Sequence, residues 1–427
     1  MNDLQRQQSP SDKPLVVIGS GLAGYTFIRE FRKLDADRKI LLLTADDGHS
    51  YSKPLLSTGF AKGKNAEHLS MADAGKMASQ LDIDIRTHTR VTAIDPEARR
   101  LDAGFEGSSS SAGETIEFTE LVLALGAEVV RPPLSGSAAD EVLSVNSLMD
   151  YRRFRERLVT VAQQRCAEGA VDRPIRIVIM GSGLIGCEFA NDLLASVDTK
   201  FTVDVISPDS RPLQRALPEQ VSLALGQGLE EAGARFHWQS TVGSVDHVSE
   251  ASAGGGSAYL VSVDGGELRT LQADVVLSAT GLRPHSALAA AAGLEVSRGI
   301  VVDRQLRTSK ADIFALGDCA EVDGHLLLYV QPLMQCARLL AANLAGGHNA
   351  DLSYQAMPVI VKTPACPLVL APPPEGLAGE WTVAEADRLD VRALFHDTEG
   401  SLRGFALSGR HVIEKQTLLR DLPPLLA

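Results

Sequence analysis

Two stretches of this sequence carry the same spacing of glycines, and that spacing suits the binding of a dinucleotide. They are Gly19-Ser20-Gly21-Leu22-Ala23-Gly24 and Gly181-Ser182-Gly183-Leu184-Ile185-Gly186. In such a turn the first glycine allows a sharp bend, the second lets the backbone approach a pyrophosphate, and the third lets the next helix pack closely on the strand. The phosphates then face the N–H groups at the positive end of that helix. One such turn has many uses, but two in matching contexts predict that one chain holds two dinucleotides.

The segments around the two turns repeat as well. Apolar, β-branched runs precede both turns and are typical of strands in a parallel sheet. The expected elements come in matching pairs: strands at 15–18 and 175–180, helices at 25–34 and 187–195, strands at 39–43 and 201–206, and closing apolar runs that end at Gly126 and Gly281. A hairpin region precedes each closing run. The repetition predicts a duplicated α/β nucleotide-binding plan.

Composition restricts the class of function. With a formal net charge of -13, the chain lacks the basic stripe that a nucleic-acid binder needs. Its five cysteines form no Cys-x-x-Cys pair and no metal-like cluster, so we expect free buried thiols, a reducing compartment and no metal site. Residues 1–13 are polar without the order of a signal peptide, and no apolar run reaches the length of a membrane span. We therefore expect a cytoplasmic protein without membrane insertion, with the Gly/Ser-rich segments 107–111 and 254–257 as solvated loop tips.

A third apolar strand, at 313–316, ends in Gly317-Asp318 and completes a pattern that covers nearly the whole chain. This pattern resembles the FAD-dependent pyridine nucleotide oxidoreductase family. The resemblance implies an α/β fold with two Rossmann-like three-layer nucleotide-binding domains, for FAD and for NAD(P)H, plus a small α+β C-terminal domain. The implied boundaries are 1–144 with 285–357 for the FAD domain, 145–284 for the NAD(P)H domain, and 358–427 for the closing domain.

The segment 50–59 distinguishes between members of that family. Relatives that use thiol chemistry place a reactive cysteine where Thr58 stands, or a Cys-x4-Cys pair just beyond the first turn, and this chain has neither. Without a redox thiol, electrons from NADH can leave only from the flavin, which can release them singly to an iron-sulfur or iron-thiolate protein. Thr58 also disfavours the members that reduce peroxide or oxygen.

Two further segments, 361–367 and 404–409, make the chain similar to the rubredoxin-reducing members of the family. The resemblance therefore implies an oxidoreductase that transfers electrons from NADH through FAD to rubredoxin in a transient complex. Reductases of ferredoxin or flavorubredoxin share the architecture and remain the alternative. A flavin-holding redox sensor without turnover is a different class, kept as a minor alternative. The oligomeric state and the pathway served stay open.

Several residues are candidates for binding FAD besides the first glycine turn. Asp46, just past the second strand, is suited to accept hydrogen bonds from the adenosine ribose, although it could only cap a turn and Asp47 competes for the role. The resemblance places Asp318 on the ribityl chain and the main chain of Val91 against adenine. It also places the backbone N–H of Val330 over the flavin, at the start of a helix in which Pro332 suits the first helical position.

Other residues are implied near the reacting rings, and no catalytic residue is expected beyond the flavin itself. Lys53 is followed by Pro54, which favours an extended backbone at Lys53, and the family places a cation there against the flavin. Lys362 is a second cation that the resemblance places at the polar edge of the flavin. Glu188 is expected in the first turn of the second helix, where the helix dipole stabilises a carboxylate even if it has no functional role. The resemblance instead places it beside flavin and nicotinamide.

The residue expected to distinguish NADH from NADPH departs from the family pattern. Relatives that prefer NADH end the second strand of the NAD domain with a glutamate that binds ribose, and this chain has Ser207 there. No arginine follows immediately to bind a 2′-phosphate, although Arg211 is near. The resemblance favours NADH, and the residues leave NADPH open.

Overall fold

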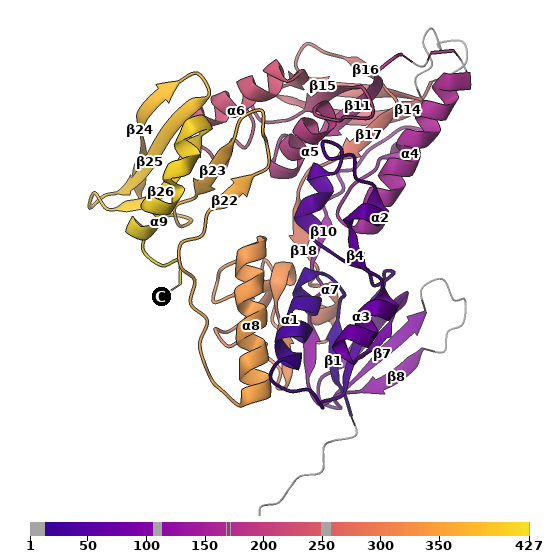
Figure 1. Ribbon diagram of the computed structural model, residues 1–427, viewed down its shortest axis with the longest axis vertical. Coiled ribbons are helices and arrows are strands. Elements are labelled where there is room, and N and C mark those ends of the chain that lie inside the picture. Colours follow the sequence, from indigo (N-terminus) through magenta and orange to yellow (C-terminus); the bar gives the residue numbers. More distant parts are fainter. Residues whose placement is uncertain (1–12, 106–112, 168, 171, 249–257, 427) are drawn as a thin grey trace, which may run out of the picture. The chain divides into compact units, whose positions relative to one another are not determined.

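The structure is a computed structural model that describes residues 13–105, 113–167, 169–170, 172–248 and 258–426. The chain divides into two compact units (Figure 1). Unit 1 comprises Met1–Tyr51, Ser70–Glu128 and Arg283–Ser353, and unit 2 comprises Ser52–Leu69, Val129–Leu282 and Tyr354–Ala427. The polar start of the chain and the two Gly/Ser-rich segments named above lie outside the described residues, except for Lys13.

Unit 1 is built on a five-stranded sheet in which every pair of neighbours is parallel. Its strand order is β20 (Ile313–Ala315), β9 (Leu121–Leu123), β1 (Leu15–Ile18), β2 (Ile40–Leu43) and β5 (Asp84–Arg86). All residues of β1, β2 and β9 are buried, as their uninterrupted apolar sequences require. Helix α1 (Leu22–Arg32) follows β1 directly and packs against α8 (Val330–Gly346). The buried face of α1 carries Tyr25, Phe27, Ile28 and Phe31.

Smaller elements complete unit 1. The predicted hairpin region contains a three-stranded antiparallel sheet of β6 (Thr89–Asp95), β7 (Arg100–Phe105) and β8 (Glu114–Glu117). The others are β3 (Ser50–Tyr51), β4 (Ser70–Ala72), α3 (Ala74–Leu81), α7 (Ala287–Ala291), β19 (Ile300–Val302), η4 (Gly317–Cys319) and β21 (Ala320–Val322).

Unit 2 repeats this plan with a four-stranded parallel sheet. Its order is β13 (Ala234–His237), β12 (Phe201–Ile206), β11 (Ile175–Met180) and β17 (Val275–Ser278). Each sheet thus places the strand before its glycine turn between the next strand and the closing strand. The helices are α2 (Ala66–Leu69), α4 (Leu148–Ala167), α5 (Leu184–Leu194) and α6 (Glu219–Glu231), and the second hairpin region forms β14 (Ser240–His247), β15 (Tyr259–Gly265) and β16 (Thr270–Ala273). Short elements are η1 (Lys53–Thr58) and η2 (Ala139–Glu141), while β10 (Ala127–Val129) and β18 (Leu282–Pro284) each include residues of both units.

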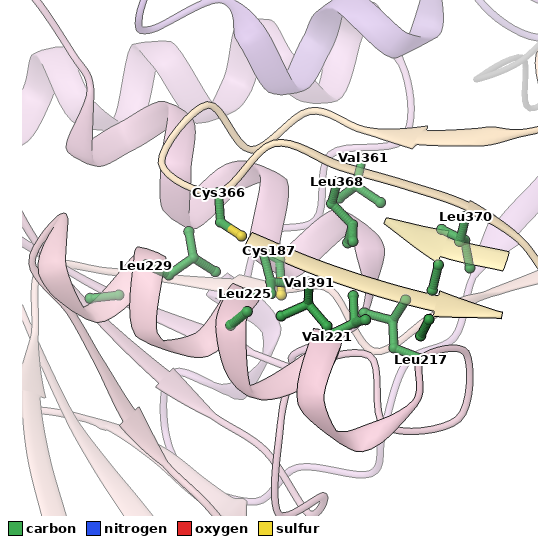
Figure 2. Packing of buried hydrophobic residues seen from close by; sticks show 14 residues of the cluster. Cys187, Leu217, Val221, Leu225, Leu229, Val361, Cys366, Leu368, Leu370 and Val391 are labelled. Atoms are coloured by element: carbon green, nitrogen blue, oxygen red, sulfur yellow. The ribbon is translucent and has the colours of Figure 1, made fainter. Parts of the chain in front are cut away.

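The C-terminal segment of unit 2 forms a five-stranded antiparallel sheet. The order is β22 (Val359–Val361), β23 (Leu368–Ala371), β26 (Leu402–Ser408), β25 (Asp390–Asp397) and β24 (Gly379–Asp387), followed by η5 (Gly409–Glu414) and α9 (Lys415–Asp421). One hydrophobic cluster joins this sheet to α5 and α6 (Figure 2). Val221 and Leu225 of α6, with Cys187 of α5, contact a group that includes Leu368 and Val391 of the sheet. Because they share a core, the sheet and the second nucleotide-binding plan fall within one unit.

Most of the elements expected from the sequence are present, with differences at their ends. Helix α1 begins at Leu22 and α5 at Leu184, so each helix starts inside its glycine turn, three residues before the predicted start. Helix α8 begins at Val330, and Pro332 is its third residue instead of its first. The first four N–H groups of a helix have no partner within it, so a proline at the third position loses no hydrogen bond. The sequence predicts a last helix from about Val412, but this helix begins at Lys415, because residues 409–414 form the tighter η5. The domain boundaries predicted from the sequence, after residues 144, 284 and 357, stay a prediction.

Within the described parts of the chain, no helix is both long enough and apolar enough to cross a membrane.

Candidate functional site

The glycine turn of unit 1 is shaped by backbone contacts that a larger residue would break. Gly19 has φ +113°, and a Cβ added there would lie 2.2 Å from the carbonyl oxygen of Ala124. A Cβ at Gly24 would lie 2.0 Å from the carbonyl oxygen of Gly19, which explains how closely α1 packs on β1. At Gly21, by contrast, a Cβ would meet nothing within 4 Å. The turn therefore leaves open space beside the first N–H groups of α1, and that space fits the phosphates of a dinucleotide.

The glycine turn of unit 2 has the same construction. Gly181 has φ +103°, and a Cβ there would lie 2.7 Å from the carbonyl oxygen of Ala279. A Cβ at Gly186 would lie 2.1 Å from the carbonyl oxygen of Gly181, and one at Gly183 would meet nothing within 4 Å. Neither α1 nor α5 has a side-chain cap or an acidic residue in its first turn, so both helix starts remain suited to an anion. The two predicted dinucleotide turns are structurally equivalent.

Asp46 is fixed beside the first glycine turn by a small hydrogen-bond network. Its Oδ1 accepts from the hydroxyl of Ser20 (2.8 Å), the hydroxyl of Thr44 (2.7 Å) and the backbone N–H of Gly48 (2.9 Å). Asp47 instead faces His49, with 3.0 Å between its Oδ1 and the ring Nδ1. The network ties Asp46, and not Asp47, to the glycine turn through Ser20. Thr44 was missed from the sequence, although its position at the end of β2 was a usable signal.

The remaining candidates of unit 1 lie in several elements. Asp318 is in η4, directly after β20, and a Cβ at the preceding Gly317 would lie 2.8 Å from the Cβ of Ala23 in the first helical turn. The side chain of Leu333 in α8 also approaches Gly317, so η4 lies beside both helices. Val330 is the first residue of α8 and is exposed, whereas Val91 is half-buried in β6. Gly126 and its counterpart Gly281 both have positive φ and open space around them.

In unit 2, Glu188 receives hydrogen bonds from two segments that are distant in sequence. Its side chain is 2% exposed. Oε1 accepts from the backbone N–H of Lys362 (3.0 Å), while Oε2 accepts from the hydroxyl of Ser57 (2.7 Å) and from the ammonium of Lys362. The structure thus joins two of the predicted site residues, Glu188 and Lys362, in a nearly buried ion pair. Ser57 was not predicted, because nothing in its local sequence reports a partner more than a hundred residues away.

Lys53 and Pro54 begin η1, the element that also carries Ser57. Ser52 has an extended backbone (φ -96°, ψ 106°), and Lys53 is already the first residue of the 3-10 helix. The extended conformation that was predicted at Lys53 is therefore found one residue earlier.

Helix α5 holds these segments through one face. Asp192 accepts from the backbone N–H groups of Phe60 (3.0 Å) and Ala61 (2.9 Å), and Asn191 accepts from that of Ala365 (3.0 Å). Residues three and four positions apart share a helix face, so Glu188, Asn191 and Asp192 act together. Burial raises the pKa of Asp192 above its usual value, although the two N–H groups oppose that shift. The η1 segment and the 362–366 segment are therefore fixed to the helix that starts at the second glycine turn.

Three of the five cysteines are buried thiols that are not activated. None of the five forms a disulfide, and Cys166 is exposed while the other four are buried. Burial raises the pKa of Cys187, Cys319 and Cys366 to about 12. Two of these thiols lie inside the hydrophobic cluster that joins α5 and α6 to the C-terminal sheet (Figure 2). A redox cysteine needs an accessible thiolate, and these three groups stay protonated near neutral pH.

Comparison with known proteins identifies the relatives of the chain. The family model described as pyridine nucleotide-disulphide oxidoreductase matches residues 13–338, and the model described as rubredoxin binding C-terminal domain matches residues 351–422. The chain is 46% identical to a rubredoxin-NAD(+) reductase of Alcanivorax borkumensis, over 97% of this chain and 99% of the relative. It is 42% identical to a rubredoxin-NAD(+) reductase of Acinetobacter baylyi, over 96% and 98% of the two chains.

Among solved structures, a putidaredoxin reductase in covalent complex with putidaredoxin has the same fold, with a TM-score of 0.79 and 23% identity over 97% of this chain and 94% of that chain. The duplicated glycine turns, the paired parallel sheets and the family model over residues 13–338 agree with one another. The chain therefore belongs to the pyridine nucleotide-disulphide oxidoreductase family.

Proposed function

We propose that this protein is a flavoenzyme that passes electrons from NADH through FAD to rubredoxin, one electron at a time. The observation that carries the proposal is the pair of equivalent dinucleotide turns in a chain whose Cys187, Cys319 and Cys366 are buried, protonated thiols. With no sulfur relay, a bound flavin can link a two-electron donor to a one-electron acceptor. Rubredoxin as acceptor is supported by the names of the relatives and by the family model over residues 351–422.

The proposal assigns FAD to unit 1 and NADH to unit 2. The backbone of the first glycine turn binds the FAD pyrophosphate, Asp46 binds the adenosine ribose, Asp318 binds the ribityl chain, and Val91, Gly126 and Val330 contribute main-chain contacts. The second glycine turn binds the NADH pyrophosphate, with Gly281 beside it. FAD, when bound, supplies the step from an electron pair to single electrons.

Glu188 has the task of orienting nicotinamide. It is the fifth residue of α5, the helix whose start receives the pyrophosphate, and so lies one turn later than predicted from the sequence. The ion pair with Lys362 and the bond from Ser57 hold its carboxylate in one position. The resemblance to the family assigns Lys53, Pro54 and Lys362 a role at the flavin. The free cysteines fit a reducing compartment, and we place the protein in the cytoplasm.

The test compares acceptors under anaerobic conditions. The FAD-loaded protein is supplied with NADH, and reduction of purified rubredoxin is followed by its absorbance, with a ferredoxin at the same concentrations as control. We expect kcat/KM for rubredoxin to exceed that for ferredoxin by about tenfold or more, which corresponds to about 1.4 kcal/mol of transition-state discrimination. A flavin that NADH bleaches but rubredoxin does not reoxidise would overturn the proposal. So would equal or faster reduction of ferredoxin.

A further inference from the structure

The loop after β12 in unit 2 repeats several backbone and hydroxyl hydrogen bonds of the loop after β2 in unit 1. In unit 1 the hydroxyls of Ser20 and Thr44 lie 2.8 Å apart and join the glycine turn to the end of the second strand. In unit 2 the hydroxyls of Ser182 and Ser207 lie 2.7 Å apart and make the same link. Ser207 therefore corresponds to Thr44.

The backbone bonds around these residues extend the correspondence. Thr44 N–H donates to the carbonyl of Arg86 (3.0 Å), and His88 N–H donates to that of Asp46 (2.9 Å). The equivalent bonds in unit 2 run from Ser207 to His237 (3.0 Å) and from Gln239 to Asp209 (3.0 Å). His88 and Gln239 have the same left-handed backbone, with φ 49° and 52°. The structure thus places Asp209 at the position in unit 2 that Asp46 occupies in unit 1.

Ser207 is unsuited to the role of the missing glutamate. It is completely buried, and its hydroxyl is already paired with that of Ser182. Asp209 is half-buried, and among the described residues its carboxylate has no hydrogen bond or ion pair. At the carboxyl ends of parallel strands, beside a dinucleotide turn, an acceptor of this kind suits the hydroxyls of an adenosine ribose.

We propose that Asp209 accepts hydrogen bonds from the 2′- and 3′-hydroxyls of the NADH adenosine ribose and repels the 2′-phosphate of NADPH. Asp209 is then the specificity-determining residue of the nucleotide site. The inference rests on the proposed function, because it requires that the nicotinamide dinucleotide binds at the Gly181 turn.

Arg211 is the competing determinant in the same loop. It is half-buried, and its Nε is buried without a hydrogen-bond partner in the described part of the chain. A guanidinium is the usual receptor for a phosphate, so Arg211 would select NADPH if it faced the ribose. The sequence spacing alone does not separate these two outcomes, whereas the repeat of unit 1 assigns the ribose position to Asp209.

The test measures binding of NAD+ and NADP+ to the oxidised, FAD-loaded enzyme by calorimetry, so that no turnover is involved. We expect the natural protein to bind NAD+ more tightly. In Asp209→Asn, which removes the charge and keeps the shape, Kd for NAD+ should rise about ten- to hundredfold, the cost of losing hydrogen bonds to a charged acceptor. Kd for NADP+ should stay the same or fall, because the repulsion is removed.

The matched control is Glu219→Gln, which removes an exposed carboxylate from the first turn of α6 in the same unit. It should leave both dissociation constants unchanged, and FAD content should match the natural protein in both variants. An unchanged NAD+ to NADP+ ratio in Asp209→Asn would overturn the inference. A natural preference for NADP+ that Arg211→Ala abolishes would overturn it as well. Failure to reduce rubredoxin, with the Asp209 effect intact, would instead overturn only the proposed function.

Discussion

The side chain of Glu188 is 2% exposed, and each of its two carboxylate oxygens accepts a hydrogen bond. The backbone N–H and ammonium of Lys362 and the hydroxyl of Ser57 all donate to it. A buried ion pair is a poor source of stability, because the cost of removing two charges from water offsets their attraction. Such a pair is more readily explained by a need to hold the carboxylate in one orientation, which fits the role proposed for it beside nicotinamide.

The first prediction concerns this carboxylate. Glu188→Gln should slow reduction of the flavin by NADH about ten- to hundredfold, because the amide cannot keep the charged hydrogen bonds that fix its position. Stopped-flow absorbance measures the rate, and FAD content should stay unchanged because Glu188 is not among the residues proposed to bind the pyrophosphate, adenosine ribose or ribityl chain of FAD. Glu219→Gln, the same substitution at an exposed site, serves as the control. Reduction of Glu188→Gln at the natural rate would contradict the role.

Only part of this site could be predicted from the sequence. The glycine turns, Asp46 and Glu188 stand at fixed offsets from local patterns, so spacing and resemblance were enough to select them. Ser57 acts through a partner that the fold brings to it from 131 residues away in sequence, and no local signal reports such a contact. The spacing that selects Asp46 also selects Asp209, the residue proposed above, since each follows the end of its strand by the same number of residues.

At the scale of elements, helix α6 illustrates how closely the C-terminal sheet segment packs on the nucleotide-binding plan of unit 2. It contributes Val221, Leu225 and Leu229 to the cluster in Figure 2. Two glycines lie in its interior, at 226 and 228, where helix propensity disfavours them by about 1 kcal/mol each. A Cβ at Gly228 would lie 2.7 Å from the Cβ of Cys366 and 2.9 Å from the carbonyl oxygen of Ala365. A Cβ at Gly226 would make an ordinary contact of 3.5 Å with Pro212.

The second prediction uses this matched pair. Gly228→Ala should destabilise the protein by about 1–3 kcal/mol, because the added methyl overlaps a backbone oxygen that cannot move independently. Gly226→Ala should be neutral or stabilising by up to about 1 kcal/mol, since it gains helix propensity without a clash. Thermal unfolding of the FAD-loaded protein measures both, and each kcal/mol should correspond to about 1 °C in Tm for a chain of this length. Equal shifts in the two variants would contradict the packing described.

The elements themselves were predicted well where the pattern is local. Strands β1, β11 and β12 begin and end at the predicted residues, because buried parallel strands are short uninterrupted apolar runs. In the C-terminal segment the sequence predicts strands at 391–395 and 402–407, which correspond to β25 and β26, whereas β22, β23 and β24 are not predicted. Strand β24 is mostly exposed, so it lacks the apolar run that marks the others. This sheet shares a core with α5 and α6. Such tertiary contacts cannot be predicted from the sequence of any single segment.

The whole molecule contains two copies of one nucleotide-binding plan. Its family is named for a disulphide, but the cysteines of this chain form none. Where thiol-using relatives carry a reactive cysteine, Thr58 stands, and its hydroxyl donates to the carbonyl of Leu55 (3.1 Å). The thiols of Cys187, Cys319 and Cys366, with pKa values raised to about 12, have almost no thiolate at neutral pH. These three thiols do not supply a redox centre beside the flavin, and we expect the electron capacity of the protein to equal that of its bound flavin.

An anaerobic titration with NADH, monitored by the flavin absorbance, tests this limit most directly. The account predicts that one NADH per FAD bleaches the flavin completely, and that two equivalents of oxidised rubredoxin then restore the colour, since each accepts a single electron. A requirement for a second NADH per FAD would contradict the account, because the extra electron pair would have to reside in a disulfide.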